Sequence, residues 1–296
     1  MTSESIRAVF EHCVPSHIPR GELWIMSQIF IDRQVEDDVD SHIALCREMG
    51  MDFVSVPVGE FQKYDSGYRL FSPSDIRKAV ETDLYVMAVL SGPFQRIVDK
   101  KGLHHTLADL AGDIVEMGMA IVAEADGVRS LIEECIKQGA NAIVIAEDLA
   151  YAMGTFFPPA AFREIIQPHY VRFVDAIRNN GSYAVFHSCG NITKLVPDIV
   201  SSGFDGLSCE QACVDLFFIK REYGTRTTLL SGISSDLLEA GPVSVEDKRR
   251  FTGLVADLSE GGGLILVSST GFYTSQMLSN ARRLYDLADE AGKQAI

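Results

Sequence analysis

The segment Tyr183-Ala-Val-Phe-His187-Ser-Cys189-Gly-Asn191 joins a short apolar run to a histidine, a cysteine and a Gly-Asn turn. A run of this length bounded by a turn signal is typical of a buried β-strand. Because side chains alternate along an extended chain, His187 and Cys189 are predicted to project to the same side. An imidazole and a thiolate at the end of a strand form half of a zinc ligand set. The alternative is ordinary packing, since a buried cysteine behaves as a small hydrophobe.

Apolar runs of similar length recur on both sides of this strand, and amphipathic segments separate them. The other predicted strands cover residues 23–26, 53–56, 84–90, 142–146, 206–208, 227–230 and 264–267. A helix over residues 3–14 is predicted to precede them. Strands that alternate with helices indicate an α/β fold with a parallel sheet. Eight such strands predict a (β/α)8 TIM barrel, formed by a single domain over residues 1–296 with an N-terminal helical extension.

The composition is that of an ordinary globular protein, with 47% hydrophobic and 23% charged residues. A net charge of -15 argues against non-specific nucleic-acid binding, which depends on Lys and Arg. The six cysteines are irregularly spaced and include no Cys-x-x-Cys pair, so no disulfide framework is predicted. No secretory signal is visible, and no apolar run approaches the roughly 18 residues of a membrane helix. A cytoplasmic protein without a membrane partner is therefore expected.

Polar residues follow several of the predicted strands, where a (β/α)8 barrel places its chemistry. Those expected to ring one mouth are Glu60, Glu147, Asp148, His187, Cys189, Glu210, Ser231 and Thr270. Acidic residues tolerate the end of a buried strand poorly unless they are paired or bound to a cation. Glu147 and Asp148 are therefore candidate catalytic residues, with helix capping as the alternative. Glu210 follows the strand after that of His187 and could complete a three-ligand zinc set with an open position.

Five segments carry a family resemblance: His17–Glu22, Ala140–Asp148, Phe157–Pro168, Phe186–Asn191 and Gly203–Glu210. Through them nearly the whole chain resembles the uroporphyrinogen decarboxylase-like superfamily. The likeness is closer to its corrinoid-dependent methyltransferase branch than to the decarboxylases. The resemblance implies a (β/α)8 barrel, in agreement with the predicted strand count.

The resemblance also implies a metal site. In the methyltransferase branch, zinc is bound by a His-x-Cys pair and a later cysteine, with a carboxylate nearby. His187 and Cys189 match the pair and Glu210 matches the carboxylate, so these three are the predicted metal ligands. The later cysteine would follow the eighth strand, where this chain has Ser268-Ser-Thr-Gly271, and no cysteine follows Cys213. Either a carboxylate replaces the missing thiolate or the metal is lost.

The leading functional prediction, implied by the resemblance, is a cobalamin-dependent methyltransferase. It would move a methyl group between a small O-, N- or S-methyl substrate or acceptor and a corrinoid carried on a partner protein, with assistance from zinc. The residues predicted to be catalytic are Glu147, Asp148 and Glu210. Those predicted to contact the cofactor are Ser231, Gly232 and Thr270. Those predicted to wall the pocket are Phe156, Phe157, Phe272 and Tyr273.

Two other functions stay open. The first is a decarboxylase with Asp148 or Glu60 as the charged catalyst. Its substrate would be less acidic than uroporphyrinogen, because a substrate with many carboxylates needs Lys or Arg at the mouth and residues 21–32 contain none. The second is a barrel that has lost its chemistry and binds a corrinoid or its carrier protein.

Overall fold

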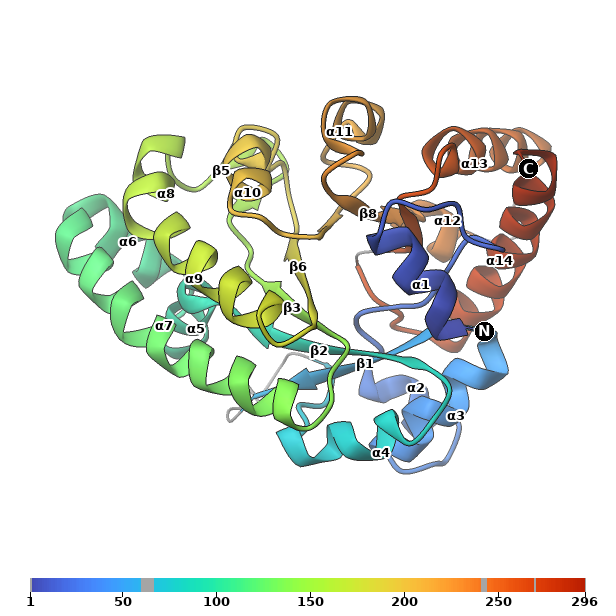
Figure 1. The fold of residues 1–296 in the computed structure, drawn as a ribbon, viewed down its shortest axis with the longest axis horizontal. Coiled ribbons are helices and arrows are strands. Elements are labelled where there is room, and N and C mark those ends of the chain that lie inside the picture. Colours follow the sequence, from blue (N-terminus) through green and yellow to red (C-terminus); the bar gives the residue numbers. More distant parts are fainter. Residues whose placement is uncertain (1, 60–66, 241–243, 269, 296) are drawn as a thin grey trace.

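The computed structural model describes residues 2–59, 67–240, 244–268 and 270–295. Its centre is a curled sheet of seven parallel strands in the order β1-β2-β3-β6-β7-β8-β9 (Figure 1). The strands are β1 (Phe53–Val58), β2 (Tyr85–Ser91), β3 (Ala142–Ala146), β6 (Tyr183–Ser188), β7 (Gly206–Cys209), β8 (Thr228–Gly232) and β9 (Leu264–Val267). All seven lie where strands are predicted. The α/β class is confirmed, in a form that resembles a TIM barrel.

The predicted first strand, residues 23–26, is an extended segment and not a strand of the sheet. The Gly21 N–H donates to the carbonyl of Leu266 in β9 (3.1 Å), and the Asp52 N–H donates to the carbonyl of Arg20 (2.8 Å). The segment around Gly21 therefore lies between the two edges of the sheet, the position of the eighth strand in a closed ring. Only isolated bridges form there, so the eight-stranded prediction is confirmed in part.

The carboxyl group of Glu22 explains why no regular ladder forms. It accepts hydrogen bonds from the Leu23 N–H (2.8 Å) and from the Ser268 N–H (3.1 Å). Both donors would otherwise be available to pair with the backbone of a neighbouring strand. The buried Glu22 carboxyl thus accepts hydrogen bonds from backbone donors that a regular ladder would use at this edge of the sheet.

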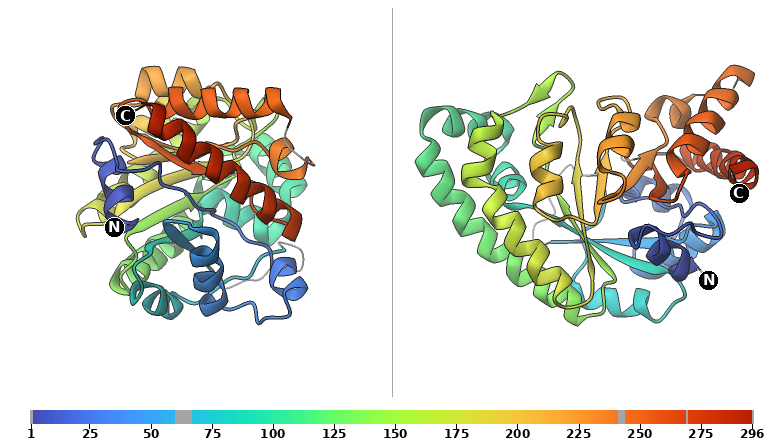
Figure 2. Two further views of the ribbon diagram at one scale, coloured as in Figure 1. Left: turned by 90° about the vertical axis from the view of Figure 1, so that its right-hand side faces the viewer. Right: turned by 45° about the horizontal axis from the view of Figure 1, so that its top comes forward.

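Helices surround the sheet, most of them on its outer face. They are α1 (Thr2–Phe10), α2 (Ser27–Asp32), α3 (Val39–Met49), α4 (Ile76–Val80), α5 (Pro93–Lys101), α6 (Leu103–Gly112), α7 (Ile114–Lys137), α8 (Pro159–Ile165), α9 (Gln167–Arg178), α10 (Val196–Ser201), α11 (Leu216–Tyr223), α12 (Ser235–Glu239), α13 (Val245–Ser259) and α14 (Ser275–Ala295). Helices α5 to α9 gather on one flank, with α13 and α14 on the other (Figures 1 and 2). Within the described ranges, no helix is long and apolar enough to cross a membrane.

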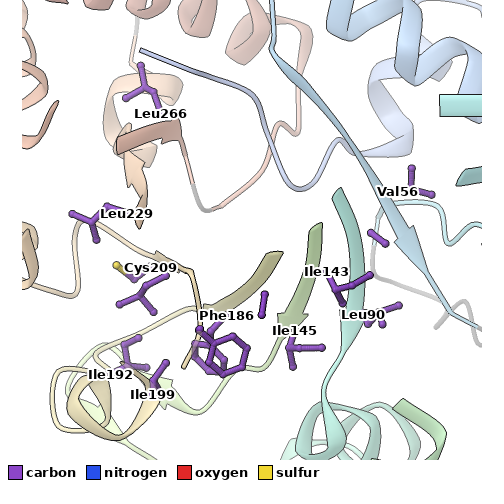
Figure 3. Packing of buried hydrophobic residues seen from close by; sticks show 14 of the residues in the cluster. Val56, Leu90, Ile143, Ile145, Phe186, Ile192, Ile199, Cys209, Leu229 and Leu266 are labelled. Atoms are coloured by element: carbon purple, nitrogen blue, oxygen red, sulfur yellow. The ribbon is translucent and has the colours of Figure 1, made fainter. Parts of the chain in front are cut away.

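The sheet separates two apolar cores, because side chains alternate along each strand. On β2, Tyr85, Met87 and Val89 belong to the inner core, while Val86 and Leu90 belong to the outer core under the helices. Figure 3 shows outer-core side chains from successive strands, among them Val56, Leu90, Ile143, Phe186 and Leu266. This alternation also decides which residues beyond each strand turn inward, toward the mouth.

Helix α1 packs against the amino ends of the strands. Its residues Ile6, Val9 and Phe10 are buried in the inner core. The ring of Phe10 stacks on that of Tyr183, the first residue of β6, with 4.7 Å between centroids. The predicted helix is present, but its character as an extension is not confirmed, because its apolar face is part of the core.

Candidate functional site

A cavity of about 200 Å³ opens at the carboxyl end of the sheet. It is lined by side chains that follow β3, β6 and β9 and by residues of the extended first segment, including Trp24, Asp148, His187, Cys189 and Tyr273. This is the end at which a barrel of parallel strands carries its chemistry. A larger cavity of about 600 Å³ lies elsewhere and is lined by none of the predicted site residues.

Three side chains converge in the smaller cavity. The ligand atoms of Asp148, His187 and Cys189 all lie within 4.8 Å of one another. The His187 Nε2 is 3.6 Å from the Cys189 Sγ, which confirms that the two side chains project to the same side. The backbone N–H of Cys189 donates to Asp148 Oδ1 (3.1 Å) and draws the carboxylate toward the pair. The register of the sheet explains this meeting, because Ala146 on β3 pairs with His187 on β6.

His187 is held as a neutral imidazole. It is 3% exposed, and burial lowers its pKa to about 3. A hydrogen bond of 2.9 Å joins its Nδ1 to the hydroxyl of Ser208 on β7, and the Trp24 ring packs edge-on with 4.3 Å between centroids. When Nδ1 carries the proton, the lone pair of Nε2 faces Cys189. A metal-binding histidine requires this protonation state and a hydrogen bond of this kind to its other ring nitrogen.

The pKa values of Cys189 and Asp148 are both raised, and a cation bound between these groups would offset that effect. Burial raises the pKa of the Cys189 thiol, and the carboxyl groups of Asp148 and Glu210 raise it further. Desolvation by its neighbours likewise raises the pKa of Asp148, although this residue keeps contact with solvent at the cavity. A bound cation would stabilise both groups in their charged forms. One imidazole, one sulfur and one carboxylate are chemically suited to zinc, and three protein ligands leave a position open.

Glu210 lies beside this group and makes other contacts. Its Oε2 accepts hydrogen bonds from the Gly190 N–H (3.3 Å) and from the Cys213 thiol (3.3 Å). Among the described residues, the group of adjacent metal-type ligands contains Asp148 and not Glu210. The role of Glu210 as a ligand or catalyst stays a prediction.

Glu147 packs between β3 and the first turn of α5. It is 1% exposed, and its Oε2 accepts from the Gln95 N–H (3.2 Å). A Cβ at Gly92 would lie 2.1 Å from its Oε1, so a glycine is needed there. Burial raises the pKa of Glu147 to about 8. These contacts favour the helix-capping interpretation, though at α5 and not in the loop after β3, and a catalytic role stays a prediction.

The predicted cofactor residues divide into two groups. Thr270 lines the cavity. Ser231 is buried and donates to the Cys209 carbonyl (2.7 Å), and neither it nor its neighbour Gly232 is part of the cavity lining. Their roles stay predictions, and Glu60 lies outside the described residues.

The predicted aromatic wall is formed only in part by the residues named for it. Tyr273 lines the cavity as expected, whereas Phe157 and Phe272 are buried in the outer core. Trp24 and Tyr68 line it in their place. Trp24 could have been suspected, since it is the chain's single tryptophan and lies at a predicted strand, whereas Tyr68 has no comparable signal.

Ser268 begins the turn in which the later zinc-binding cysteine was expected. It is buried, and its hydroxyl donates to Glu22 Oε2 (2.5 Å). Its side chain therefore holds the Glu22 carboxyl at the edge of the sheet. Burial raises the pKa of Glu22 to about 7.

Glu22 predicts a pH dependence of stability. The folded protein keeps a proton on Glu22 up to about pH 7, whereas the unfolded chain releases it near 4.5. This stabilisation is complete below the unfolded pKa and is lost as the pH rises through the folded pKa. We expect Glu22→Gln to remove roughly 3 kcal/mol of the decrease in unfolding free energy between pH 4 and pH 8, measured by urea denaturation. The exposed Glu164→Gln is the control, and equal pH profiles for the wild type and Glu22→Gln would contradict the assignment.

Comparison with known proteins gives concordant results. The sequence model of the family described as uroporphyrinogen decarboxylase (URO-D) matches residues 67–291. The methylcobamide:CoM methyltransferase MtaA of Methanosarcina barkeri is 26% identical over 243 residues, which cover 81% of this chain and 68% of that protein. MtaA of strain Fusaro is 27% identical over 73% of this chain, which spans only 61% of that relative. A methyltransferase from Methanosarcina mazei has a similar fold, with a TM-score of 0.79, 17% identity and 98% coverage of both chains.

Proposed function

Because this chain belongs to the uroporphyrinogen decarboxylase (URO-D) family, on its methyltransferase branch, we propose that it is a cobalamin-dependent methyltransferase. It moves a methyl group between a small O-, N- or S-methyl substrate or acceptor and a corrinoid carried by a partner protein. The observation that carries this proposal is the convergence of Asp148, His187 and Cys189 in a cavity at the carboxyl end of the sheet.

Each residue has a defined task in this proposal. Asp148, His187 and Cys189 would hold zinc, which supplies a Lewis acid able to keep a thiol or alcohol deprotonated near neutral pH. Ser208 fixes the His187 ring through Nδ1, and Trp24 packs against that ring. Thr270, at the rim of the cavity, contacts the corrinoid or the substrate.

In this proposal Asp148 takes the place of the missing later cysteine. Its carboxylate comes from β3, on the other side of the His-x-Cys pair from the turn after β9. In that turn the Ser268 hydroxyl is committed to Glu22. A carboxylate carries the same charge as the thiolate that it replaces, so the site keeps two anionic ligands for a divalent cation.

The ligand set can be tested with one isosteric pair of variants. Asp148→Asn removes the charge but keeps a weak oxygen ligand, so we expect zinc affinity to fall roughly tenfold or more, measured by competition with a chelating dye. Glu210→Gln is the matched variant, since it also neutralises one carboxylate beside Cys189. A larger loss in Glu210→Gln than in Asp148→Asn would show that Glu210 is the third ligand.

The activity is tested by following the cobalt absorbance of free cob(I)alamin with zinc-loaded protein and a panel of methoxy, methylthio and methylamine compounds. Formation of methylcobalamin from one class of donor, or its consumption by a thiol, alcohol or amine acceptor, supports the proposal. Release of carbon dioxide from a carboxylate substrate without any corrinoid would instead identify a decarboxylase. Corrinoid binding without either reaction would indicate that the protein binds corrinoids and has neither activity.

A further inference from the structure

Acidic side chains line part of the described cavity wall. Among the lining residues that the structure describes, Asp99, Glu147 and Asp148 are acidic and none is Lys or Arg. The arginine next to Gln95 in sequence, Arg96, is paired with Glu124 at 3.0 Å. Burial raises the pKa of Glu147 to about 8 and Asp148 belongs to the proposed metal site, so Asp99 is the carboxylate that a charged group of the substrate would meet. An anionic group beside Asp99 would find no described counter-charge, which is unfavourable in a partly desolvated site.

Asp99 is the acidic residue whose charge is available to a ligand. It lies on α5 and is half-buried. Gln95 Nε2 donates to its Oδ1 (2.9 Å) and the Ser91 hydroxyl donates to its Oδ2 (3.3 Å). These neutral donors fix the carboxylate without cancelling its charge. Within the described ranges, no ion pair involves Asp99, whereas Asp148 is engaged with Cys189 and Glu147 with the start of α5.

Aromatic rings complete this side of the cavity. Burial raises the pKa of Tyr68 to about 12, and the charges of Asp99 and Asp148 add to that effect, so the phenol lies within the field of both carboxylates. The indole of Trp24 hydrogen-bonds to the same phenol. Tyr273 lines the cavity and is half-exposed. Rings beside a carboxylate are the surroundings in which proteins bind organic cations, through cation–π attraction.

We propose that the cavity selects a small substrate that carries a positively charged group, with that group held by Asp99 and the rings of Trp24 and Tyr68. The reacting heteroatom lies beside His187 and Cys189, and this part of the inference rests on the proposed function. The cavity of about 200 Å³ suits a small substrate, and a second cavity of about 590 Å³ shares Thr270 and Tyr273 with it. Aminothiols, amino alcohols and their methyl ethers form the substrate class.

The single tryptophan provides the assay, because Trp24 lines the cavity and its fluorescence reports occupancy. Three thiols serve as probes: 2-aminoethanethiol, its uncharged counterpart 1-propanethiol, and the anionic mercaptoacetate. We expect 2-aminoethanethiol to bind at least about tenfold more tightly than 1-propanethiol, and mercaptoacetate to bind most weakly. Asp99→Asn is expected to abolish the preference for the amine. Asp257→Asn, an equal change of charge at an exposed position on α13, is expected to preserve it.

The wild-type series decides the inference even if a variant folds poorly. Equal binding of the three thiols, or preference for mercaptoacetate, would overturn it. The titrations are run on metal-free and on zinc-loaded protein. A preference for the amine in metal-free protein that binds no zinc would support cation selection while rejecting the proposed metal chemistry. Methyl transfer confined to neutral or anionic substrates would leave the proposed function standing and reject cation selection.

Discussion

Replacement of Cys189 by serine is expected to lower zinc affinity about a hundredfold or more and to abolish corrinoid-linked methyl transfer. Structural zinc sites contribute about 10–16 kcal/mol from four ligands, so the loss of one strong ligand costs roughly 3 kcal/mol or more. Serine keeps the size of the side chain, but its hydroxyl is a much poorer zinc ligand than a thiolate. The affinity is measured by chelator competition. The Co²⁺-loaded protein is expected to lose the charge-transfer absorption of a thiolate ligand.

Cys213→Ser is the matched control for this result. Cys213 is the other half-buried cysteine near the site, and its thiol donates to Glu210 instead of facing His187. We expect Cys213→Ser to retain most of the zinc affinity and the charge-transfer band. If the two serine variants lost zinc equally, Cys213 would be a ligand. If neither lost it, the His-x-Cys pair would not bind the metal.

Much of the fold can be predicted from local sequence. Residues 142–146 form β3 with the predicted bounds, because a continuous apolar run between polar residues leaves few alternatives. The first segment differs because its structure depends on a distant partner. Glu22 is separated by 246 residues from Ser268, and their hydrogen bonds take up donors that a ladder would use. No local pattern indicates that contact.

In the candidate site, too, some features follow from local sequence and others depend on distant residues. The shared direction of His187 and Cys189 follows from alternation within one strand and was predictable. Asp148 could be named as a candidate, but its place opposite Cys189 depends on the register between β3 and β6, which is a long-range property. Asp99 lies on a helix and has no local sequence signal at all. Asp99, the carboxylate proposed to determine selectivity, was therefore the least predictable part of the site.

The second large effect is expected from a substitution at Gly190, the residue after Cys189. Gly190 has a φ of +77°, and a Cβ there would lie 2.6 Å from the carbonyl oxygen of Ala150. Ala150 belongs to the small antiparallel pair of β4 (Ala150–Tyr151) and β5 (Gly154–Thr155), which packs on this turn. A backbone carbonyl cannot swing away as a flexible side chain can. We expect Gly190→Ala to lower the free energy of unfolding by about 3 kcal/mol and to displace Cys189 from His187, so that zinc affinity also falls.

Gly181→Ala distinguishes the strain of a positive φ from the steric clash with Ala150, the two causes of the stability loss expected in Gly190→Ala. Gly181 has a φ of +79°, but no atom lies within 4 Å of the position of its Cβ. Alanine at position 181 therefore experiences only the strain of the left-handed conformation, about 1 kcal/mol. Gly181 precedes the amino end of β6, away from the carboxyl end that carries the site, so zinc affinity is expected to stay at the wild-type value. Equal losses of stability in urea denaturation would show that backbone strain alone limits the turn. Unchanged zinc binding in Gly190→Ala would show that the contact with Ala150 does not position Cys189.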